Sequence, residues 1–374
     1  MKITFVLPSL GRSGGMRVLS KYTELLQKRG HKIVIVSTPQ KQPTSIQQLR
    51  SLIKGKGWLP PLPKEESHFD NMDVECHVLE THRQITNRDV PDADIIMATW
   101  WETAEWVAAL SPSKGAKVYF IQHYEAFDYL PQGRVEATWR LPMHKIVVAK
   151  WLADIAREKY NDLCISVVPP TVDTKKFYDV QSQAQQPRGK QSVPTVGMYY
   201  TTTPWKGCKM AIEAFSLAAK KIPNLRLVAF GSGDTPPPDL LLPPGTEYNM
   251  SPTQEELTKF YSKCDAWLFS SISEGFGLPI IEAMACGTPV IGTTAGAAPE
   301  LLAGGGGILV NIKDSEAMAK AIEQICQLSD AEWQIMSENA LDTVTNYTWE
   351  DSTALFEAAL YTALERQAQL TDKA

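Results

Sequence analysis

Short apolar runs alternate along most of this chain with stretches whose apolar residues recur every three or four positions. The first pattern is typical of buried strands, and the second is typical of helices that cover a sheet. In the first half, the runs lie at 3–7, 32–36, 94–98, 117–121, 145–148 and 165–168, and the helical spacing is clearest at 18–29 and 151–160. Strands that alternate with helices predict an α/β protein with a doubly wound parallel sheet.

The same alternation begins again after a polar stretch. Gln181–Pro194 has few apolar residues and is the best candidate for a linker. Beyond it, strands are expected at 195–200, 225–230 and 265–270, and helices at 209–222, 315–328 and 331–344. The 374 residues therefore predict an N-terminal domain at 1–180, a linker at 181–194, a C-terminal domain at 195–345 and a terminal helix at 346–374.

The composition is that of a soluble globular protein, with 44% hydrophobic and 21% charged residues. The six cysteines include no C-x-x-C pair, which favours reduced thiols in a cytoplasmic protein. No apolar run is long enough to span a membrane, and the N-terminal run is too short for a signal peptide. The net charge is −5, but the first half is mildly basic, which hints at an anionic partner there. We expect no nucleic acid partner.

Two glutamates flank a glycine-rich turn in the second half. Glu274 is followed by Gly275-Phe276-Gly277-Leu278-Pro279, and Glu282 lies one turn into an apolar helix expected from Leu278 to Gly287. The glycines let the backbone approach a ligand closely, and the proline suits the first turn of a helix. Backbone N–H groups of that turn can donate hydrogen bonds. Acidic groups beside such donors suit a polyhydroxylated ligand.

This segment resembles the E-x7-E signature of the family 4 retaining glycosyltransferases, because it also contains Gly-Phe-Gly-Leu-Pro and continues into Ala-Met-Ala-Cys-Gly-Thr-Pro-Val-Ile. The resemblance implies a GT-B fold, in which two Rossmann-like domains face a cleft and the C-terminal helix crosses back to the first domain. It implies that Glu282 binds the ribose of a nucleotide sugar. The sugar itself would be bound by Glu274 and by the backbone of Gly275, Phe276, Gly277 and Leu278.

Lys206 lies between an expected strand and an expected helix, and the resemblance implies that it pairs with the diphosphate of the donor. The family usually has an arginine a few residues earlier, where this chain has Thr201-Thr202-Thr203. Hydroxyls bring no charge to a phosphate, and charge-assisted hydrogen bonds are about twice as strong as neutral ones. Either another cation reaches the diphosphate or the donor is bound more weakly.

Gly14 and Gly15 follow the first expected strand and precede the first expected helix. Backbone N–H groups at such a place can meet a phosphate, so both residues are candidates for donor binding. A dinucleotide site and a plain tight turn are the alternatives. The dinucleotide interpretation lacks the G-x-G-x-x-G spacing and an acidic residue after the second strand.

His123 follows an apolar strand, and the resemblance implies that it contacts the donor sugar and is needed for transfer. A structural histidine is the alternative interpretation. Further candidates, for the acceptor side, are Tyr124, Asp128 and Trp100-Trp101-Glu102. Residues 41–73, rich in Gln, Pro and Lys, are expected to form a loop whose role the sequence does not indicate.

A metal site is not expected. Cys76, His77 and His82 fit no standard zinc spacing, and no D-x-D motif lies where a metal-dependent glycosyltransferase would need it. We therefore expect no cofactor besides the nucleotide sugar, which is a substrate.

These features predict a retaining, metal-independent glycosyltransferase with Glu274, His123 and Lys206 as catalytic residues. Its expected partners are a nucleotide sugar and a glycan or lipid-linked acceptor, with peripheral membrane contact through the N-terminal domain. The expected location is the cytoplasm, including the membrane surface. The alternatives are another GT-B enzyme (a phosphorylase or a nucleotide-sugar epimerase), a catalytically weakened nucleotide-sugar-binding subunit and, more remotely, a dinucleotide-dependent oxidoreductase. Fold alone does not decide among them.

Overall fold

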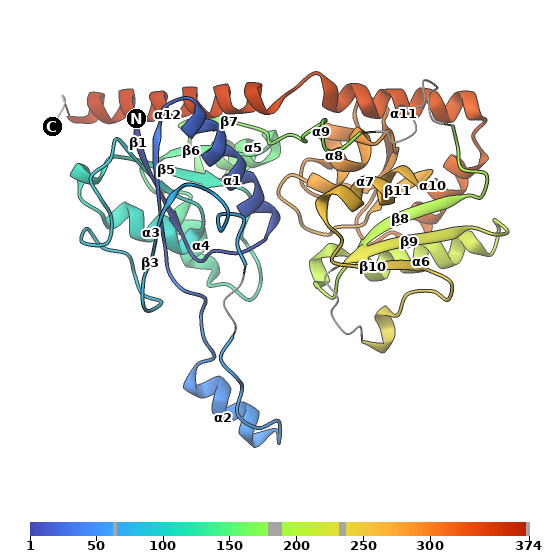
Figure 1. Cartoon of the computed structure of the whole chain (residues 1–374), viewed down its shortest axis with the longest axis horizontal. Coiled ribbons are helices and arrows are strands. Elements are labelled where there is room, and N and C mark those ends of the chain that lie inside the picture. The colour runs from blue at the N-terminus through green and yellow to red at the C-terminus, as the bar shows by residue number, and fades with distance from the viewer. Residues whose placement is uncertain (63–65, 179–188, 232–236, 372–374) are drawn as a thin grey trace. The chain divides into compact units, whose positions relative to one another are not determined.

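The computed structural model describes residues 1–62, 66–178, 189–231 and 237–371 and divides into two compact units (Figure 1). The first unit contains Met1–Val148, Leu152–Val168 and Thr353–Ala374. The second contains Ala149–Trp151 and Pro169–Ser352. Each unit is a parallel sheet covered by helices, which confirms the predicted α/β class.

The first unit has a parallel sheet in the order β3-β2-β1-β4-β5-β6-β7. The strands are β1 (Lys2–Leu7), β2 (Lys32–Ser37), β3 (Glu75–Val78), β4 (Ile95–Ala98), β5 (Ala116–Ile121), β6 (His144–Val147) and β7 (Ile165–Val167). The helices of this part of the chain are α1 (Gly14–Lys28), α2 (Ser45–Ile53), α3 (Trp101–Ala109), α4 (Gln132–Thr138) and α5 (Lys150–Tyr160). Because β1 pairs with both β2 and β4, the chain changes its winding direction there. In sheets of this kind, ligands bind beyond the carboxyl ends of the strands at such a switch point.

The second unit repeats this plan with the sheet order β10-β9-β8-β11-β12-β13. Its strands are β8 (Thr195–Tyr200), β9 (Arg226–Gly231), β10 (Glu247–Met250), β11 (Ala266–Phe269), β12 (Val290–Thr293) and β13 (Gly307–Val310). Its helices are α6 (Cys208–Ala219), α7 (Gln254–Ser262), α8 (Leu278–Ala285), α9 (Ala298–Leu302), α10 (Ser315–Gln327) and α11 (Asp330–Thr345). The switch point lies between β8 and β11, which pair in parallel.

Aromatic residues fill the core of each unit. In the first unit, Tyr22 of α1 stacks on Phe356 of the last helix, α12 (Trp349–Thr371), with ring centroids 4.3 Å apart, and both rings meet Phe120 of β5. In the second unit, the Trp267 ring of β11 packs against the rings of Phe230 and Tyr261, with centroids 5.3 and 4.4 Å away. Because Phe356 packs against α1 and β5, the part of α12 from Thr353 onward belongs to the first unit.

The chain passes between the units at Val168–Pro169 and returns within α12 at Ser352–Thr353. Both crossings meet at one carbonyl, because the hydroxyls of Ser352 and Tyr347 donate hydrogen bonds to the Pro169 carbonyl at 2.7 and 3.0 Å. Most of the linker predicted at Gln181–Pro194 lies outside the described residues, so the linker stays a prediction.

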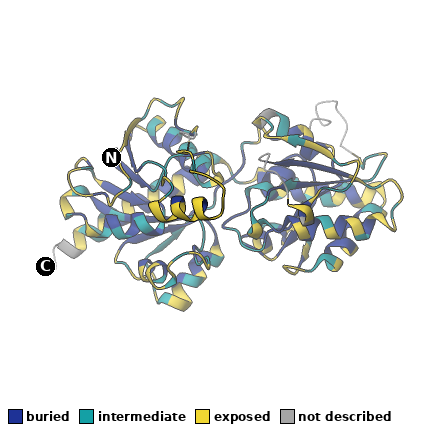
Figure 2. Cartoon of the chain, turned by 90° about the horizontal axis from the view of Figure 1, so that it is seen from below, coloured by how far each residue is buried: buried dark blue, intermediate teal, exposed yellow. Residues whose placement is uncertain are grey.

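Residues 41–73 were predicted to form a loop, but they contain the helix α2 (Figures 1 and 2). A capping box between Thr44 and Gln47 starts this helix. Its burial is inverted: Gln48 and Ser51 are buried, whereas the apolar side chains are exposed. The exposed fractions are 65% for Ile46, 59% for Leu49 and 76% for Ile53. No helix in the described part of the chain is long and apolar enough to cross a membrane.

Candidate active site

The glycine-rich turn connects β11 to α8 at the switch point of the second unit. The helix begins at Leu278, as predicted, and Gly277 caps it with φ = 104°, a conformation that favours glycine. A Cβ added at Gly277 would lie 3.0 Å from the Ile280 side chain, so a residue with a side chain has little room at this position. Pro279 occupies the first turn of the helix.

An ion pair forms beside this turn. Lys206, at the end of the short 3-10 helix η3 (Pro204–Lys206), places its Nζ 2.5 Å from Oε2 of Glu274. The two side chains are 28% and 15% exposed. The Ser271 hydroxyl donates to the same carboxylate oxygen at 3.2 Å. Lys206 follows β8 and Glu274 follows β11, so the two neighbouring strands of the switch point bring these residues together.

Backbone packing holds Lys206 in this place. Gly207 adopts φ = 65°, and a Cβ there would lie 1.9 Å from the carbonyl oxygen of Ser270. The Ser270 hydroxyl donates to the Lys206 carbonyl at 3.0 Å, and the Ile272 N–H donates to the Trp205 carbonyl at 2.8 Å. The lysine loop is therefore tied directly to the loop that carries Glu274.

A second glycine supports Glu274 from another side. Gly296 has φ = 62°, and a Cβ there would come within 3.0 Å of the Glu274 Cβ and 3.1 Å of its carbonyl oxygen. A side chain at this position would displace the glutamate. Gly207 and Gly296 were not predicted as site residues, because their importance depends on contacts with residues distant in sequence.

Glu282 lies in α8 but is only 5% exposed. Its Oε2 accepts a hydrogen bond from the Tyr261 hydroxyl at 2.8 Å. Tyr261 belongs to α7 and is fully buried, and the sequence did not indicate it. The tyrosine orients the carboxylate, and the predicted contact of Glu282 with a ribose remains a proposal.

The threonines that replace the expected arginine bond to their own loop. Thr201 is buried, and its hydroxyl donates to the Thr203 hydroxyl at 3.1 Å and accepts from the Thr203 N–H at 3.2 Å. Thr201 N–H points at the sulfur of Cys208, 3.4 Å away. This loop therefore shapes the approach to Lys206 without adding charge.

The first unit brings a different set of predicted residues together. Gly14 and Gly15 form the first turn of α1, where the Ser13 hydroxyl accepts from the Met16 N–H. The Gln122 side-chain amide donates to the Gly15 carbonyl at 3.2 Å. Gln122 immediately precedes His123 at the carboxyl end of β5, so the glycine turn and the histidine lie at the same edge of the sheet.

His123 is held in one orientation. Its Nδ1–H donates to the Tyr124 carbonyl at 2.8 Å, because a carbonyl can only accept. The ring also stacks on Phe127, with centroids 4.8 Å apart. These contacts hold the plane of the ring and favour the tautomer with the hydrogen on Nδ1.

Two of the other acceptor-side candidates, Tyr124 and Glu102, have structural partners. The Tyr124 hydroxyl lies 3.1 Å from the Tyr160 hydroxyl and accepts from Lys159 at 2.7 Å. Glu102 pairs with Lys41 at 3.0 Å. Asp128 is exposed, and Trp101 is buried.

Glu125 is a buried acid that the sequence analysis did not identify. It is 2% exposed and accepts hydrogen bonds from the Trp101 N–H at 2.8 Å and the Tyr119 hydroxyl at 3.4 Å. Burial raises the pKa of Glu125 well above its usual range. Its position two residues after His123, at the end of an apolar strand, was the available signal.

We expect Glu125→Gln to flatten the pH dependence of stability. Because the folded-state pKa is raised, the contribution of Glu125 is fully present below its unfolded pKa near 4.5 and is lost as the pH rises through the folded value. The uncharged glutamine removes this loss. Between pH 4.5 and the raised folded-state pKa, the free energy of unfolding of the variant should therefore increase relative to that of the wild type by about 1 kcal/mol per pH unit. Urea unfolding from pH 5 to pH 8 measures this, with the exposed Glu158→Gln as control, and parallel wild-type and Glu125→Gln curves would contradict it.

Within the described residues, no group of three or more His, Cys, Asp or Glu side chains is arranged to hold a metal ion. His77 pairs with Glu75 at 2.8 Å, and His82 lies edge-on to Trp106. Metal independence stays a prediction.

Residues 190–327 match the family model described as "Glycosyl transferases group 1". The chain is 27% identical to a D-inositol 3-phosphate glycosyltransferase of Corynebacterium efficiens over 95% of this chain and 91% of that protein. It is 34% identical to the O-antigen chain mannosyltransferase B of Escherichia coli over 26% of each chain. A solved structure of HepE from Anabaena in complex with UDP-glucose superimposes with a TM-score of 0.69 at 17% identity, over 97% of this chain and 99% of that one.

The two doubly wound units and the structural likeness define the GT-B fold. With the family match and the named relatives, the chain is a glycosyltransferase of that fold class.

Proposed function

We propose that this enzyme transfers a sugar from a nucleotide diphosphate to an acceptor hydroxyl with retention of the anomeric configuration and without a metal ion, as a member of family 4. The observation that carries the proposal is the Lys206–Glu274 ion pair beside the glycine turn, at the switch point of the second unit. Such a pair offers one cation for a departing diphosphate and one carboxylate for sugar hydroxyls. HepE, whose solved complex contains UDP-glucose, has the same fold.

The donor would be bound by the second unit. Lys206 would contact the diphosphate, and Glu274 with the backbone of Gly275–Leu278 would bind the sugar. Glu282, oriented by Tyr261, would bind the ribose. In the reaction, the bond between the anomeric carbon and the diphosphate oxygen breaks, and the acceptor oxygen bonds to that carbon on the same face. The acceptor proton passes to the departing phosphate oxygen.

The acceptor would be bound by the first unit, where His123 is fixed by Tyr124 and Phe127. We propose that His123 contacts the donor sugar and that the Gly14–Gly15 turn contributes backbone donors. The mildly basic first half of the sequence is compatible with a glycan or lipid-linked acceptor that carries phosphate.

A thermal-shift screen against UDP-, GDP- and dTDP-sugars tests this proposal. A donor present at 100 times its Kd adds about 2.7 kcal/mol to stability. Wild-type protein should respond to one nucleotide class, and Lys206→Met should lose most of that response. NMR of the product then reports the anomeric configuration. Inversion would contradict retention, and no response to any nucleotide sugar would contradict the function.

Transfer should persist in excess EDTA, since Lys206 would supply the charge that a metal supplies to the diphosphate in other enzymes. Initial rates before and after chelation measure this. A loss of activity that only Mg²⁺ or Mn²⁺ restores would show that the transfer depends on a metal.

The threonine loop favours a second candidate function, a nucleotide-sugar-binding subunit with weakened catalysis. The loop has threonines in place of a charged residue, so it brings no second charge to the diphosphate. The hydroxyls of Thr201 and Thr203 also bond to each other. Tight donor binding without turnover, for any acceptor offered, would favour this candidate over the enzyme.

We also propose that α2 makes the predicted peripheral contact with an anionic membrane surface. Its polar side chains are used internally: Gln48 bonds to the backbone of Leu59, and Ser51 bonds to the Gly57 carbonyl. Ile46, Leu49 and Ile53 are left exposed, and Trp58 follows them at 70% exposure. Apolar side chains on a surface helix suit the boundary between headgroups and acyl chains.

The basic residues in and next to α2 favour a membrane surface that is anionic. Arg50, Lys54 and Lys56 lie in or next to α2, and the sequence has no acidic residue from 25 to 64. Basic residues near an anionic membrane contribute about 1 kcal/mol each. A neutral protein partner would not need this excess of positive charge.

Vesicle sedimentation checks this proposal. Replacing Arg50, Lys54 and Lys56 by glutamine should weaken binding to phosphatidylglycerol vesicles by about two orders of magnitude. Replacing Ile46, Leu49 and Ile53 by serine should also reduce it. The control replaces Lys32, Arg88 and Arg157 by glutamine in the same unit. Equal binding to pure phosphatidylcholine vesicles, or no effect of either triple substitution, would refute the contact.

A further inference from the structure

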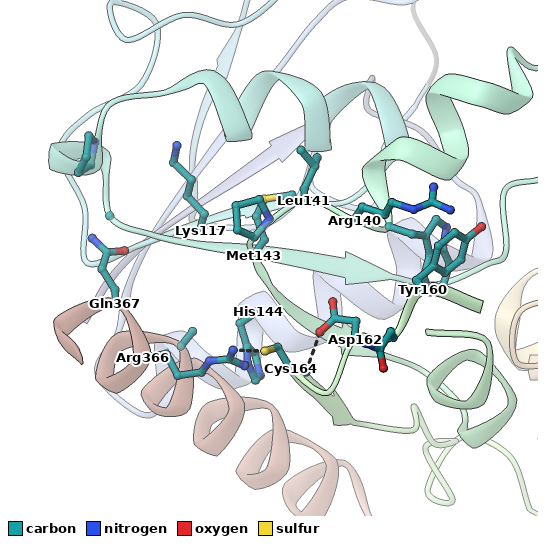
Figure 3. Close-up of a pocket in the computed structure, with 16 residues that line it drawn as sticks. Lys117, Arg140, Leu141, Met143, His144, Tyr160, Asp162, Cys164, Arg366 and Gln367 are labelled. Atoms are coloured by element: carbon teal, nitrogen blue, oxygen red, sulfur yellow. Dashed lines mark hydrogen bonds between the residues drawn. The ribbon is translucent and has the colours of Figure 1, made fainter. Parts of the chain in front are cut away.

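The first unit contains a pocket whose wall includes Tyr160, the residue that contacts Tyr124 (Figure 3). Its walls include Lys117 at the start of β5, His144 at the start of β6 and Cys164 just before β7. These three strands are parallel, so the pocket opens at their amino ends. His123 follows the carboxyl end of β5, at the opposite edge of the same sheet.

Three cationic side chains from different elements reach this pocket (Figure 3). The Lys117 ammonium donates to the carbonyls of Ala108 and Leu110, both at 2.6 Å. Arg140 lies over the Tyr160 ring at 4.9 Å and donates to the Glu136 carbonyl. None of Lys117, Arg140 and Arg366 forms an ion pair with another residue in the described part of the chain.

Arg366, from α12, is held by neutral groups. One nitrogen of its guanidinium lies 3.3 Å from Nδ1 of His144, and another donates to the sulfur of Cys164. Burial lowers the pKa of His144 to about 4, so the imidazole is neutral and can accept from the arginine. The partners orient the guanidinium but do not balance its charge.

The single carboxylate of the pocket wall is already paired. Asp162 accepts from the ammonium of the buried Lys145 and from the Cys164 N–H at 2.7 Å. This pair is neutral as a unit, so the pocket keeps an excess of positive charge. Arg366 is half-buried, and its charge is therefore available to an anion that enters the pocket.

The rest of the wall is mostly apolar. Trp139, Leu141, Pro142, Met143 and Ala363 line the pocket, whose volume is about 840 Å³. This volume lies within the range of sites for small molecules, which combine apolar walls with a few placed polar groups. A ligand that matches this wall carries an anionic group on an apolar body.

We propose that this pocket binds a phosphate ester with an apolar body, with the phosphate at Arg366 and the apolar body against Leu141 and Met143. A guanidinium offers paired N–H donors that match the oxygens of a phosphate. The proposal does not depend on the function proposed above. An occupied pocket would join α12 to the strands β6 and β7, which is the position of an effector or anchoring site.

Decyl phosphate is the probe, with decanol and decyltrimethylammonium as its neutral and cationic counterparts, all below their micelle concentrations. Calorimetry gives the affinity, and the rate of Cys164 alkylation, read by peptide mass in a Cys76→Ser background, gives the location. We expect decyl phosphate alone to bind and to slow alkylation. Arg366→Met should weaken binding by about tenfold or more. Arg157→Met, on α5 of the same unit, is the control.

A nucleotide sugar should not compete with decyl phosphate, since the two occupy different sites. Butyl phosphate separates the two sources of such a ligand. Protection that equals that of decyl phosphate supports a soluble phosphate ester, and protection that increases with chain length supports a lipid. Equal protection by decanol, or full binding by the folded Arg366→Met variant, would overturn the proposal. The comparison of decyl phosphate with decanol on the wild-type protein tests the idea even where Arg366→Met fails to fold.

Discussion

Lys206→Met is expected to lower kcat/KM for the nucleotide sugar by about a hundredfold or more, the usual size of an electrostatic deletion at a reacting group. The diphosphate gains charge as it departs, and Lys206 is the cation that the switch point of the second unit supplies. Lys206→Arg should recover part of the loss, because charge is kept while the shape changes. Initial rates at a saturating acceptor concentration measure both variants, and thermal unfolding checks their fold.

A matched ion pair in the same unit provides the control. Lys221, which follows the end of α6, lies 2.9 Å from Glu323 of α10. Lys221→Met should therefore change kcat/KM little. If Lys206→Met stays within threefold of the wild type, a loss of only about 0.65 kcal/mol, then some other cation carries the diphosphate.

The size of this expected effect follows from what replaces the usual arginine. The Thr201 and Thr203 hydroxyls bond to each other, and Thr201 is buried. The Thr201 hydroxyl cannot donate to a diphosphate without giving up its bond to Thr203, and neither hydroxyl carries a charge. A diphosphate that is bound by two cationic side chains keeps one of them after a single substitution. In this chain the Thr201–Thr203 loop supplies no second cation, so the loss of Lys206 should have a larger effect.

Local sequence signals predicted the fold and much of the candidate site. The alternating apolar pattern placed most strands of the two sheets but missed the edge strands β3, β10 and β13, which are not fully buried. The Gly277–Pro279 pattern placed the start of α8 at Leu278. Lys206 and Glu274 were each found from a local pattern. Their pairing was not, because it depends on which strands of the sheet are neighbours, and one sequence does not specify strand order.

The features missed by the sequence analysis depend on contacts between distant residues. Tyr261 orients Glu282 from another helix, and Gly207 matters because the Ser270 carbonyl lies against it. The helix α2 was missed for a different reason. Its apolar residues are exposed, and two of its polar residues, Gln48 and Ser51, are buried, so the rule that apolar spacing marks a core-facing helix did not apply.

Glu274→Ala is expected to abolish measurable transfer while the protein stays folded. The side chain belongs to the site rather than to the core, because within the described residues its carboxylate bonds to the side chains of Lys206 and Ser271. Glu274→Gln keeps the shape and an oxygen for the Ser271 hydroxyl but removes the charge. We therefore expect a partial loss of about tenfold to a hundredfold, the difference between charged and neutral hydrogen bonds to a substrate. Glu323→Gln is the matched control.

Combining Glu274→Gln with Lys206→Met tests whether the pair acts on one bound donor. Two groups joined by a 2.5 Å contact and serving one substrate should lose less together than the product of their single losses. A Glu274→Ala enzyme that still transfers sugar would refute the assignment of the glycine-turn site. Multiplicative losses in the double variant would show that the lysine and the glutamate act independently, and the ion pair would then be a resting contact that the bound donor replaces.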